Sequence, residues 1–123
     1  MIIVGTKVIA SDNSGVRFGV CIRILGAQRY KRAVIGDKIV IAVKNAAQHK
    51  KVKKHDVCTA LVVRQTYNYR RYTGIYISFR KNAIVVIDKK RSVAVGTRFF
   101  GPLVYELRRK RNLKLVSLAT SII

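Results

Sequence analysis

The chain has 123 residues, of which half are hydrophobic, and 26 Lys and Arg against 5 Asp and Glu give it a formal net charge of +21. A disordered polycation would be poor in Val, Ile and aromatic residues, so this composition indicates a folded core beneath a cationic surface. Mutual repulsion at this charge density destabilises the compact state, and we therefore expect a polyanionic partner, with nucleic acid as the first candidate.

The length suits one domain, and we predict a single domain over residues 1–123. The longest apolar runs, residues 39–43 and 83–87, are far shorter than the roughly 18 residues that a membrane span requires, so no membrane insertion is expected. The N-terminal residues carry neither a secretion-signal pattern nor an amphipathic leader, and we expect no import or export address.

The first half of the chain alternates apolar and polar residues between turn signals, which is typical of strands with one face on a core. Strands are predicted at residues 7–10, 16–25, 38–43 and 57–66, and a turn at the sequence Asp-Asn-Ser-Gly of residues 12–15. In the second strand the face expected to meet the core is Phe18, Val20, Ile22 and Ile24. In the third strand the corresponding face is Ile39, Ile41 and Val43.

The second half predicts a projecting hairpin, a further strand and a short helix. A Tyr- and Arg-rich segment, residues 67–72, leads through Gly74 into a returning alternation, as in a hairpin arm. Residues 83–87 form an apolar strand. Pro102 precedes Leu-Val-Tyr-Glu-Leu-Arg, which suits a short helix with Pro in its first turn. Several short strands in one domain favour a small closed β-barrel over a parallel α/β sheet.

Basic clusters with aromatic neighbours are the strongest chemical signal, because Lys and Arg neutralise phosphates while Arg and Tyr planes stack on unpaired bases. A merely soluble surface would mix both signs of charge, and five acids cannot balance 26 bases. The charge clusters leave RNA and DNA both open. The residues predicted to contact the nucleic-acid backbone are Arg29, Lys31, Arg32, Lys50, Lys51, Lys53, Lys54, Arg70, Arg71, Arg80, Lys81, Arg108, Arg109 and Arg111.

Other chemistries find little support. His49 and His55 lie between lysines without a third ligand, so no metal site is predicted, and no cofactor is expected. The five acids are scattered and no nucleophile, Walker or zinc-protease motif is present, so we predict no enzyme activity. Cys21 and Cys58 lie far apart without a Cys-x-x-Cys pair and are predicted to be buried, reduced thiols.

Several strings, in order and at near-constant spacing, resemble one family over the whole chain: the universal large-subunit ribosomal protein of the L-fourteen family. In the first half they are Ser-Asp-Asn-Ser-Gly at 11–15, Cys-Ile-Arg-Ile-Leu-Gly at 21–26, Lys-Val-Lys-Lys at 51–54 and Ala-Leu-Val-Val-Arg at 60–64. In the second half they are Asn-Ala at 82–83, Gly-Thr-Arg at 96–98, Phe-Gly-Pro at 100–102 and Glu-Leu-Arg at 106–108.

The resemblance implies a mainly β fold: a small closed five-stranded β-barrel with a projecting β-hairpin and a short C-terminal helical region. It implies a structural role in the large subunit, with binding to large-subunit rRNA near the subunit interface and a bridge to small-subunit rRNA. The implied protein neighbours belong to the L-nineteen and L-three families. In bacteria and organelles a ribosome-silencing factor docks on the family's C-terminal block, and the matching positions are Thr97, Arg98 and Lys114.

Two other functions stay open at this point. A barrel that binds single-stranded nucleic acid outside the ribosome would stack bases on Tyr67, Tyr69 and Tyr72. A membrane-active cationic protein would need an amphipathic helix, which the sequence does not show. If Ile75, Ile77 and the segment Phe99-Phe100 face solvent, we expect protein partners to dock there. The excess of Ile, Lys, Arg and Tyr and the lack of a leader favour a mitochondrial ribosome in the matrix, with the bacterial cytoplasm or the plastid stroma as alternatives.

Overall fold

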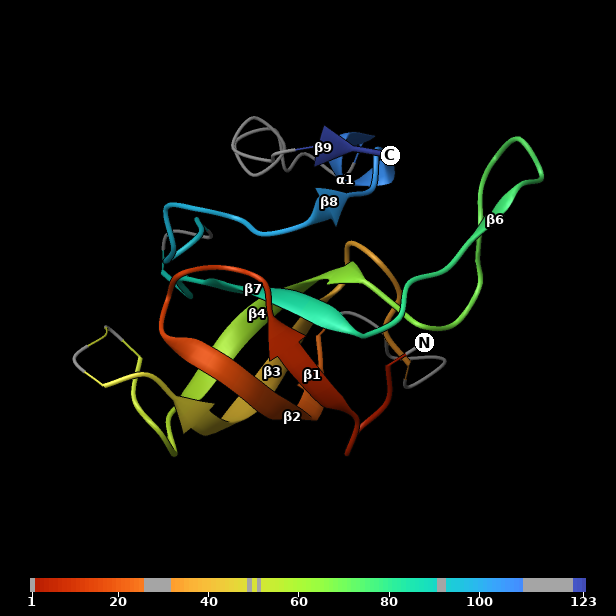
Figure 1. Cartoon of the computed structure of the whole chain (residues 1–123). Coiled ribbons are helices and arrows are strands. Elements are labelled where there is room, and N and C mark those ends of the chain that lie inside the picture. The colour runs from red at the N-terminus through yellow and green to blue at the C-terminus, as the bar shows by residue number, and fades with distance from the viewer. Residues whose placement is uncertain (1, 26–31, 49, 51, 91–92, 110–120) are drawn as a thin grey trace.

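The computed structural model describes residues 2–25, 32–48, 50, 52–90, 93–109 and 121–123. Five strands form a closed barrel in the order β1-β2-β3-β4-β7 (Figure 1). Their bounds are β1 Lys7–Ala10, β2 Val16–Ile24, β3 Lys38–Ala46, β4 Val57–Arg64 and β7 Ala83–Ile87. Neighbouring strands are antiparallel except at the closure, where β1 runs parallel to β7 with Ile9 opposite Ala83. The predicted mainly β fold with a closed five-stranded barrel is confirmed.

The predicted core face of β2 is wrong, whereas that of β3 is confirmed. Ile39, Ile41 and Val43 are buried as expected, but in β2 the buried residues are Val16, Gly19 and Cys21, and Ile22 is 44 % exposed. The pairing of β2 with β3 shifts register three times along the strand. Each bulge adds a residue to one strand, so the simple two-residue alternation cannot hold across it.

The barrel interior is filled by aliphatic side chains from all five strands, which the alternation of the strands brings inward. Strand β3 contributes Ile39 and Ile41, which share one buried cluster with Val62 of β4 and Ile84 of β7. Ile2 closes one end, where its backbone exchanges hydrogen bonds with Ala33.

A second hydrophobic core lies on the outer face of β4 and β7. Leu61 and Val63 of β4 and Val85 of β7 point outward and are buried beneath Phe99 and Leu107. We name residues 96–107, which supply this cover, the C-terminal block. Strands β4 and β7 are consequently apolar on both faces, which explains their near-continuous hydrophobic sequences.

The C-terminal block contains two short elements and is completed by the end of the chain. Strand β8, Pro102–Leu103, pairs in parallel with β9, Ser121–Ile122, and the helix α1 spans Glu106–Arg109. The prediction that Pro102 lies in the first turn of the helix is therefore wrong. Pairing with β9 and the full burial of Leu103 hold Pro102 and Leu103 in an extended conformation instead. Pro is acceptable in such a short strand because it has no N–H to leave unpaired.

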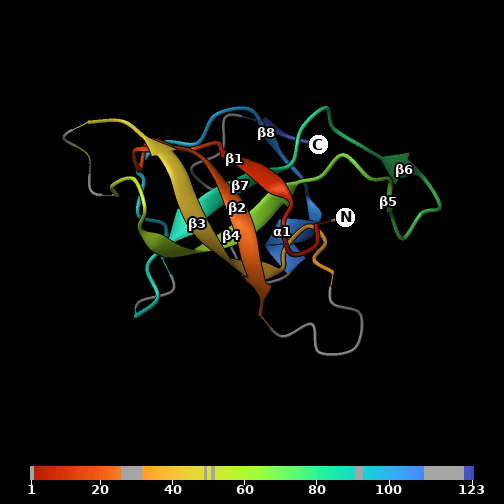
Figure 2. The same cartoon turned by 90° about the horizontal axis from the view of Figure 1, so that it is seen from below.

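A narrow hairpin, here called the arm, projects away from the barrel (Figures 1 and 2). It consists of β5, Tyr69–Arg70, and β6, Tyr76–Ile77, in antiparallel pairing. The predicted projecting hairpin is thus confirmed. The helix in the described residues is too short and too polar to cross a membrane.

Candidate nucleic-acid interface

The lysine-rich segment between β3 and β4 contains a tight turn at residues 52–56, all of which the structure describes. Val52 is buried in the barrel core, and the Asp56 carboxylate accepts the Lys53 backbone N–H at 3.0 Å. His55 adopts a positive φ of 74°, a conformation found mostly in tight turns. The turn presents Lys53 and Lys54 to solvent, where both are exposed. The loop therefore offers clustered cations at defined positions.

The base of the arm is anchored by two amide side chains. Gln65 is 1 % exposed, and it accepts the Ile35 N–H at 3.2 Å and donates to the Tyr67 carbonyl at 3.0 Å. Asn82, on the returning strand of the arm, accepts the Thr66 N–H at 3.0 Å. Because the buried amide of Gln65 would lose these hydrogen bonds if the chain moved, the contacts fix where the arm leaves the barrel.

The arm carries exposed tyrosines beside exposed cations. Tyr72 at the tip is 97 % exposed, and Tyr67 and Tyr76 are each 60 % exposed. Tyr69 differs, since it packs against the second hydrophobic core and burial raises the pKa of its hydroxyl. Of the three tyrosines predicted to stack bases in the single-strand alternative, two are thus available and Tyr69 serves packing.

Arg71 differs from its neighbour Arg70 in being tied to the C-terminal block. Its Nε lies 3.0 Å from Glu106 Oε1, and both side chains are only about one-fifth exposed, at 21 % and 20 %. The Nε–H of Arg71 does not point at Glu106 Oε1, so the contact is an ion pair without a hydrogen bond. Arg71 also donates to the Ile123 carbonyl. Arg70 is exposed, so of this pair it is the one whose charge is free to meet a phosphate.

The turn after β1 fastens the loop that begins the C-terminal block. Asn13 Oδ1 accepts the backbone N–H groups of Thr97, at 2.8 Å, and Arg98, at 3.2 Å, and its Nδ2 donates to Thr97 Oγ1 at 3.0 Å. Gly96 lies so close that a Cβ there would come within 2.7 Å of Asn13 Oδ1. The exposed side chains of Thr97 and Arg98 therefore project from a backbone that is held in place.

Asp12 is a buried carboxylate with a structural task. It is 6 % exposed; one oxygen accepts the Val86 N–H at 3.0 Å, and the other accepts the Ser14 hydroxyl at 2.7 Å. Desolvation raises its pKa above the ordinary value despite these hydrogen bonds. It links the turn of residues 12–15 to β7, so the predicted turn is confirmed and carries a buried hydrogen-bond network.

Arg64, at the end of β4, holds the other side of the C-terminal block. Its Nη1 donates to the carbonyls of Phe100, at 3.0 Å, and Pro102, at 3.3 Å, and its half-buried position lowers the pKa of the guanidinium. Gly101 has a positive φ of 79°, and a Cβ at this position would collide with the guanidinium. This arginine is therefore used for packing the chain against itself.

Eight of the fourteen predicted backbone contacts have a described side chain. Seven of these are exposed and the eighth, Arg71, is the partner of Glu106. The seven are Arg32, Lys50, Lys53, Lys54, Arg70, Arg80 and Lys81. Arg29, Lys31, Lys51, Arg111 and Lys114 lie outside the described residues, and the side chains of Arg108 and Arg109 are likewise not described.

The exposed candidates do not form one patch. The lysine-rich loop and the arm lie on opposite sides of the barrel in both views (Figures 1 and 2). Four further cations, which the cluster search on the sequence missed, are exposed on the outer face of β2 and β3: Arg17, Arg23, Lys38 and Lys44. Each stands without another Lys or Arg next to it in the sequence, so counting charge clusters could not identify them.

The described residues provide no alternative chemistry. Among them no group of three or more His, Cys, Asp or Glu side chains is placed to hold a metal ion. Cys21 and Cys58 are free thiols, as predicted, although Cys58 is only half-buried. Burial raises the pKa of both thiols, and Asp56 adds to the effect at Cys58, which makes them poor nucleophiles.

Comparison with known families decides what this cationic barrel is. The family model described as Ribosomal protein L14p/L23e matches residues 1–123. The chain belongs to this family. An L14p/L23e protein is a component of the large ribosomal subunit with a structural rather than an enzymatic role, so the resemblance found in the sequence is confirmed.

Membership in L14p/L23e accounts for a surface that is cationic on several sides. A structural protein inside a ribonucleoprotein particle meets polyanion in more than one direction. The exposed apolar residues complement this picture. Ile75 on the arm is 61 % exposed and Phe100 is 56 % exposed, whereas Ile77 is half-buried and Phe99 is buried. Only part of the surface predicted for protein partners is therefore open to solvent.

Proposed function

We propose that this L14p/L23e protein binds large-subunit rRNA through its exposed Lys and Arg side chains and acts as a structural link near the subunit interface. The observation that carries the proposal is the separation of the exposed cations: Lys53 and Lys54 lie on one side of the barrel and Arg70 lies on the arm at the other. A protein with contacts in both directions joins distant RNA segments. We infer that residues 1–123 act as one domain in this role.

The test is the salt dependence of binding to an isolated large-subunit rRNA fragment. If about a dozen cations neutralise phosphates, the slope of log affinity against log salt is on the order of −10. A slope near zero would contradict the mechanism. In parallel, the protein should be recovered stoichiometrically with large subunits after a moderate salt wash, whereas a single-strand binder acting outside the ribosome would be washed away.

The family resemblance also suggests specific RNA and protein partners. We propose a bridge to small-subunit rRNA, neighbours of the L-nineteen and L-three families, and docking of a ribosome-silencing factor on Thr97, Arg98 and Lys114. The hydrogen bonds from Asn13 support the last proposal, because they hold the Thr97 and Arg98 backbone ready for a partner. Loss of factor binding in Arg98→Ala, with rRNA affinity nearly unchanged, is the expected result; equal binding by the variant would contradict it.

We also propose a mitochondrial ribosome as the site of action, supported by the high content of Ile, Lys, Arg and Tyr. Antibody detection of the chain in purified mitochondrial, plastid and cytoplasmic ribosomes tests this directly. Recovery with plastid or cytoplasmic ribosomes would overturn the mitochondrial assignment and leave the ribosomal role intact.

A further inference from the structure

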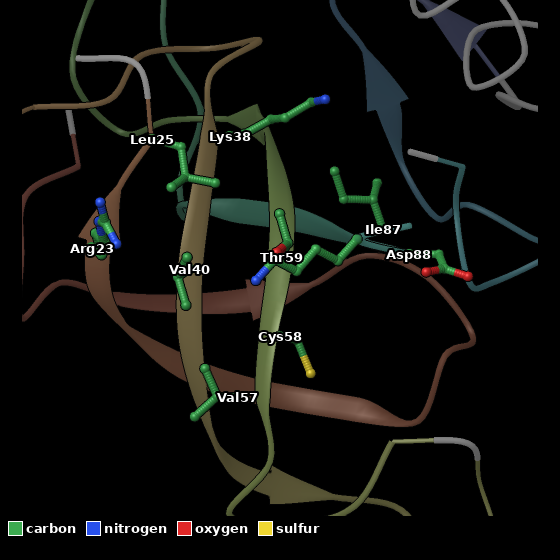
Figure 3. Close-up of a pocket in the computed structure, with 10 residues that line it drawn as sticks. Arg23, Leu25, Lys38, Val40, Val57, Cys58, Thr59, Ile87 and Asp88 are labelled. Atoms are coloured by element: carbon green, nitrogen blue, oxygen red, sulfur yellow. The ribbon is translucent and has the colours of Figure 1, made fainter. Parts of the chain in front are cut away.

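A groove on the outer face of the barrel has a floor made by four laterally paired residues. Arg23 of β2 pairs with Val40 of β3, Val40 pairs with Thr59 of β4, and Thr59 pairs with Ile87 of β7. Directly opposed residues point to the same face of a sheet, so this row forms one continuous surface across four strands. The space above it has a volume of about 280 Å³. Figure 3 shows the row together with the side chains around it.

The groove begins where the C-terminal block stops covering the sheet. The next outward residues along the two strands, Leu61 on β4 and Val85 on β7, are 2 % and 0 % exposed beneath the block. Thr59 remains half-buried and the β2 end of the row is open. The groove is therefore the uncovered continuation of an apolar outer face, bounded on one side by the molecule's own structure.

The walls combine apolar side chains with cations. Leu25, Val57 and Cys58 add to the apolar lining, while Arg23, Lys38 and Lys89 supply positive charge. Asp88 is the one carboxylate in the lining, and its Oδ1 accepts the Lys90 backbone N–H at 3.0 Å. Among the described residues none of the three cations has a carboxylate within ion-pair distance. Figure 3 shows Arg23 and Asp88 at opposite ends of the groove.

This combination matches the chemistry of a nucleotide. A base presents two apolar faces and a polar edge, while its phosphate is anionic; bases outside a helix are commonly held by stacking on an Arg plane. The groove, at about 280 Å³, lies near the lower limit of roughly 300 Å³ for small-molecule pockets, so it suits a single nucleotide rather than a length of strand. Thr59 adds a hydroxyl that can meet the base edge.

We propose that this outer-face groove binds one unstacked nucleotide of RNA, with the base against Val40 and Arg23 and the phosphate beside Lys38 and Lys89. The proposal rests on the proposed rRNA binding and adds a site at which one base is recognised. An acidic peptide with apolar side chains would also meet these cations, but the charge of +21 on the whole chain favours nucleic acid.

The test compares three short RNA hairpins at matched salt: one fully paired, one with a single bulged adenosine, and one with an abasic residue at the bulge. The full-length protein should bind the bulged hairpin roughly tenfold more tightly than the other two, which is the usual effect of stacking one base. Equal affinity for the bulged and abasic hairpins would overturn the proposal without any variant. A steep salt slope in that same experiment would still support rRNA binding, so the two failures are distinguishable.

Matched variants localise the effect. Arg23→Gln should abolish the preference for the bulged adenosine, while Arg17→Gln, which removes the same charge from another exposed position of β2, should keep it. Likewise Val40→Glu should abolish it and Val4→Glu, which adds the same charge at an exposed apolar position outside the groove lining, should keep it. If both members of a pair behave alike, the groove is not the site.

An acidic peptide of alternating Glu and Leu serves as competitor. Its failure to displace the bulged hairpin at equal ionic strength supports the nucleotide. The opposite result would be displacement of the hairpin at a peptide concentration lower than the hairpin itself requires for binding. If that displacement is lost in Arg23→Gln and Val40→Glu, the proposal is overturned in favour of a protein partner.

Discussion

The outer face of the barrel divides into two regions that meet at a single residue pair. Lys38 of β3 lies directly opposite Leu61 of β4, yet Lys38 is exposed and Leu61 is 2 % exposed beneath the C-terminal block. Beneath the C-terminal block the outward residues of β4 and β7 are aliphatic and the chain covers them itself, whereas Val57 and Thr59 of β4 lie beyond the block and line the groove. On the β2–β3 side cations stand between small or aliphatic residues, and no described segment covers them. The outward residues thus decide which part of the outer face is covered by the chain itself and which stays exposed.

The largest effect is expected from breaking the covered side at this pair. Leu61→Ala removes a buried side chain from the second hydrophobic core and should lower the free energy of unfolding by about 2–5 kcal/mol. Lys38→Ala, at the neighbouring position, should change it by less than about 0.5 kcal/mol. Urea unfolding of both variants measures the difference. Similar losses would mean that the two faces are not energetically distinct.

A smaller effect is expected from releasing the C-terminal block at Arg64. Arg64→Met keeps much of the packing but leaves the Phe100 and Pro102 carbonyls without their donor, at a cost of about 1–3 kcal/mol. Hydrogen exchange should show faster exchange in the block and little change in the barrel interior. The control Arg80→Met removes an exposed arginine and should leave both stability and exchange unchanged.

Asp12, which is hydrogen-bonded to β7 on the covered side, should make the stability of the protein depend on pH. In the native state the pKa of Asp12 is raised above its ordinary value of 3.8. As the pH rises above 3.8, the unfolded chain releases the Asp12 proton while the native state still holds it. Stability from this group is therefore lost with rising pH. Asp12→Asn removes this loss, and its cost at low pH should be only about 1 kcal/mol because the Ser14 hydroxyl can turn to accept a hydrogen bond.

The check is chemical denaturation of wild type and Asp12→Asn at several pH values from 3 to 7. The stability of the wild type relative to the variant should fall as pH rises. A relative stability that rises with pH would show that hydrogen bonding outweighs desolvation at this carboxylate.

The smallest expected effects distinguish the two adjacent arginines of the arm. Arg70→Gln should reduce the magnitude of the salt slope for rRNA binding by roughly 0.7–0.9, the value for one phosphate contact, without changing stability. Arg71→Gln loses an ion pair whose side chains are only about one-fifth exposed and should lower stability by about 1 kcal/mol, with a smaller change in slope. The reverse pattern would assign Arg71, and not Arg70, to RNA.

Local sequence predicted the elements well where neighbouring residues decide them. The bounds of β1 and β7 agree with the alternation in the sequence, and the turn at Asp12 and the arm at Gly74 follow from local turn residues. The sequence did not predict the phase of β2, because bulges depend on the partner strand. The extended conformation at Pro102 likewise depends on β9, which lies far along the chain.

The candidate surface was predictable to a similar degree. Clusters such as Lys53-Lys54 could be found by counting charges, and they are exposed. The groove could not be found in this way, since Arg23, Val40, Thr59 and Ile87 are spread over four strands and become neighbours only through register. The structural use of Arg64 and Arg71 was equally hidden, because a sequence does not show which cation meets a carbonyl or a carboxylate of its own chain.

The parallel pairing of β1 with β7 also orders events during synthesis. The barrel cannot close until Ala83 has been synthesised and can pair with Ile9. Asp12 likewise cannot accept its hydrogen bond from Val86 until that residue has been synthesised. At about 5–20 residues per second the free edge of β1 stays unpaired for several seconds on the translating ribosome. During that time an apolar strand edge is open to wrong pairing. A chaperone, or a nascent rRNA segment that binds the early cations, would have its greatest influence in this interval.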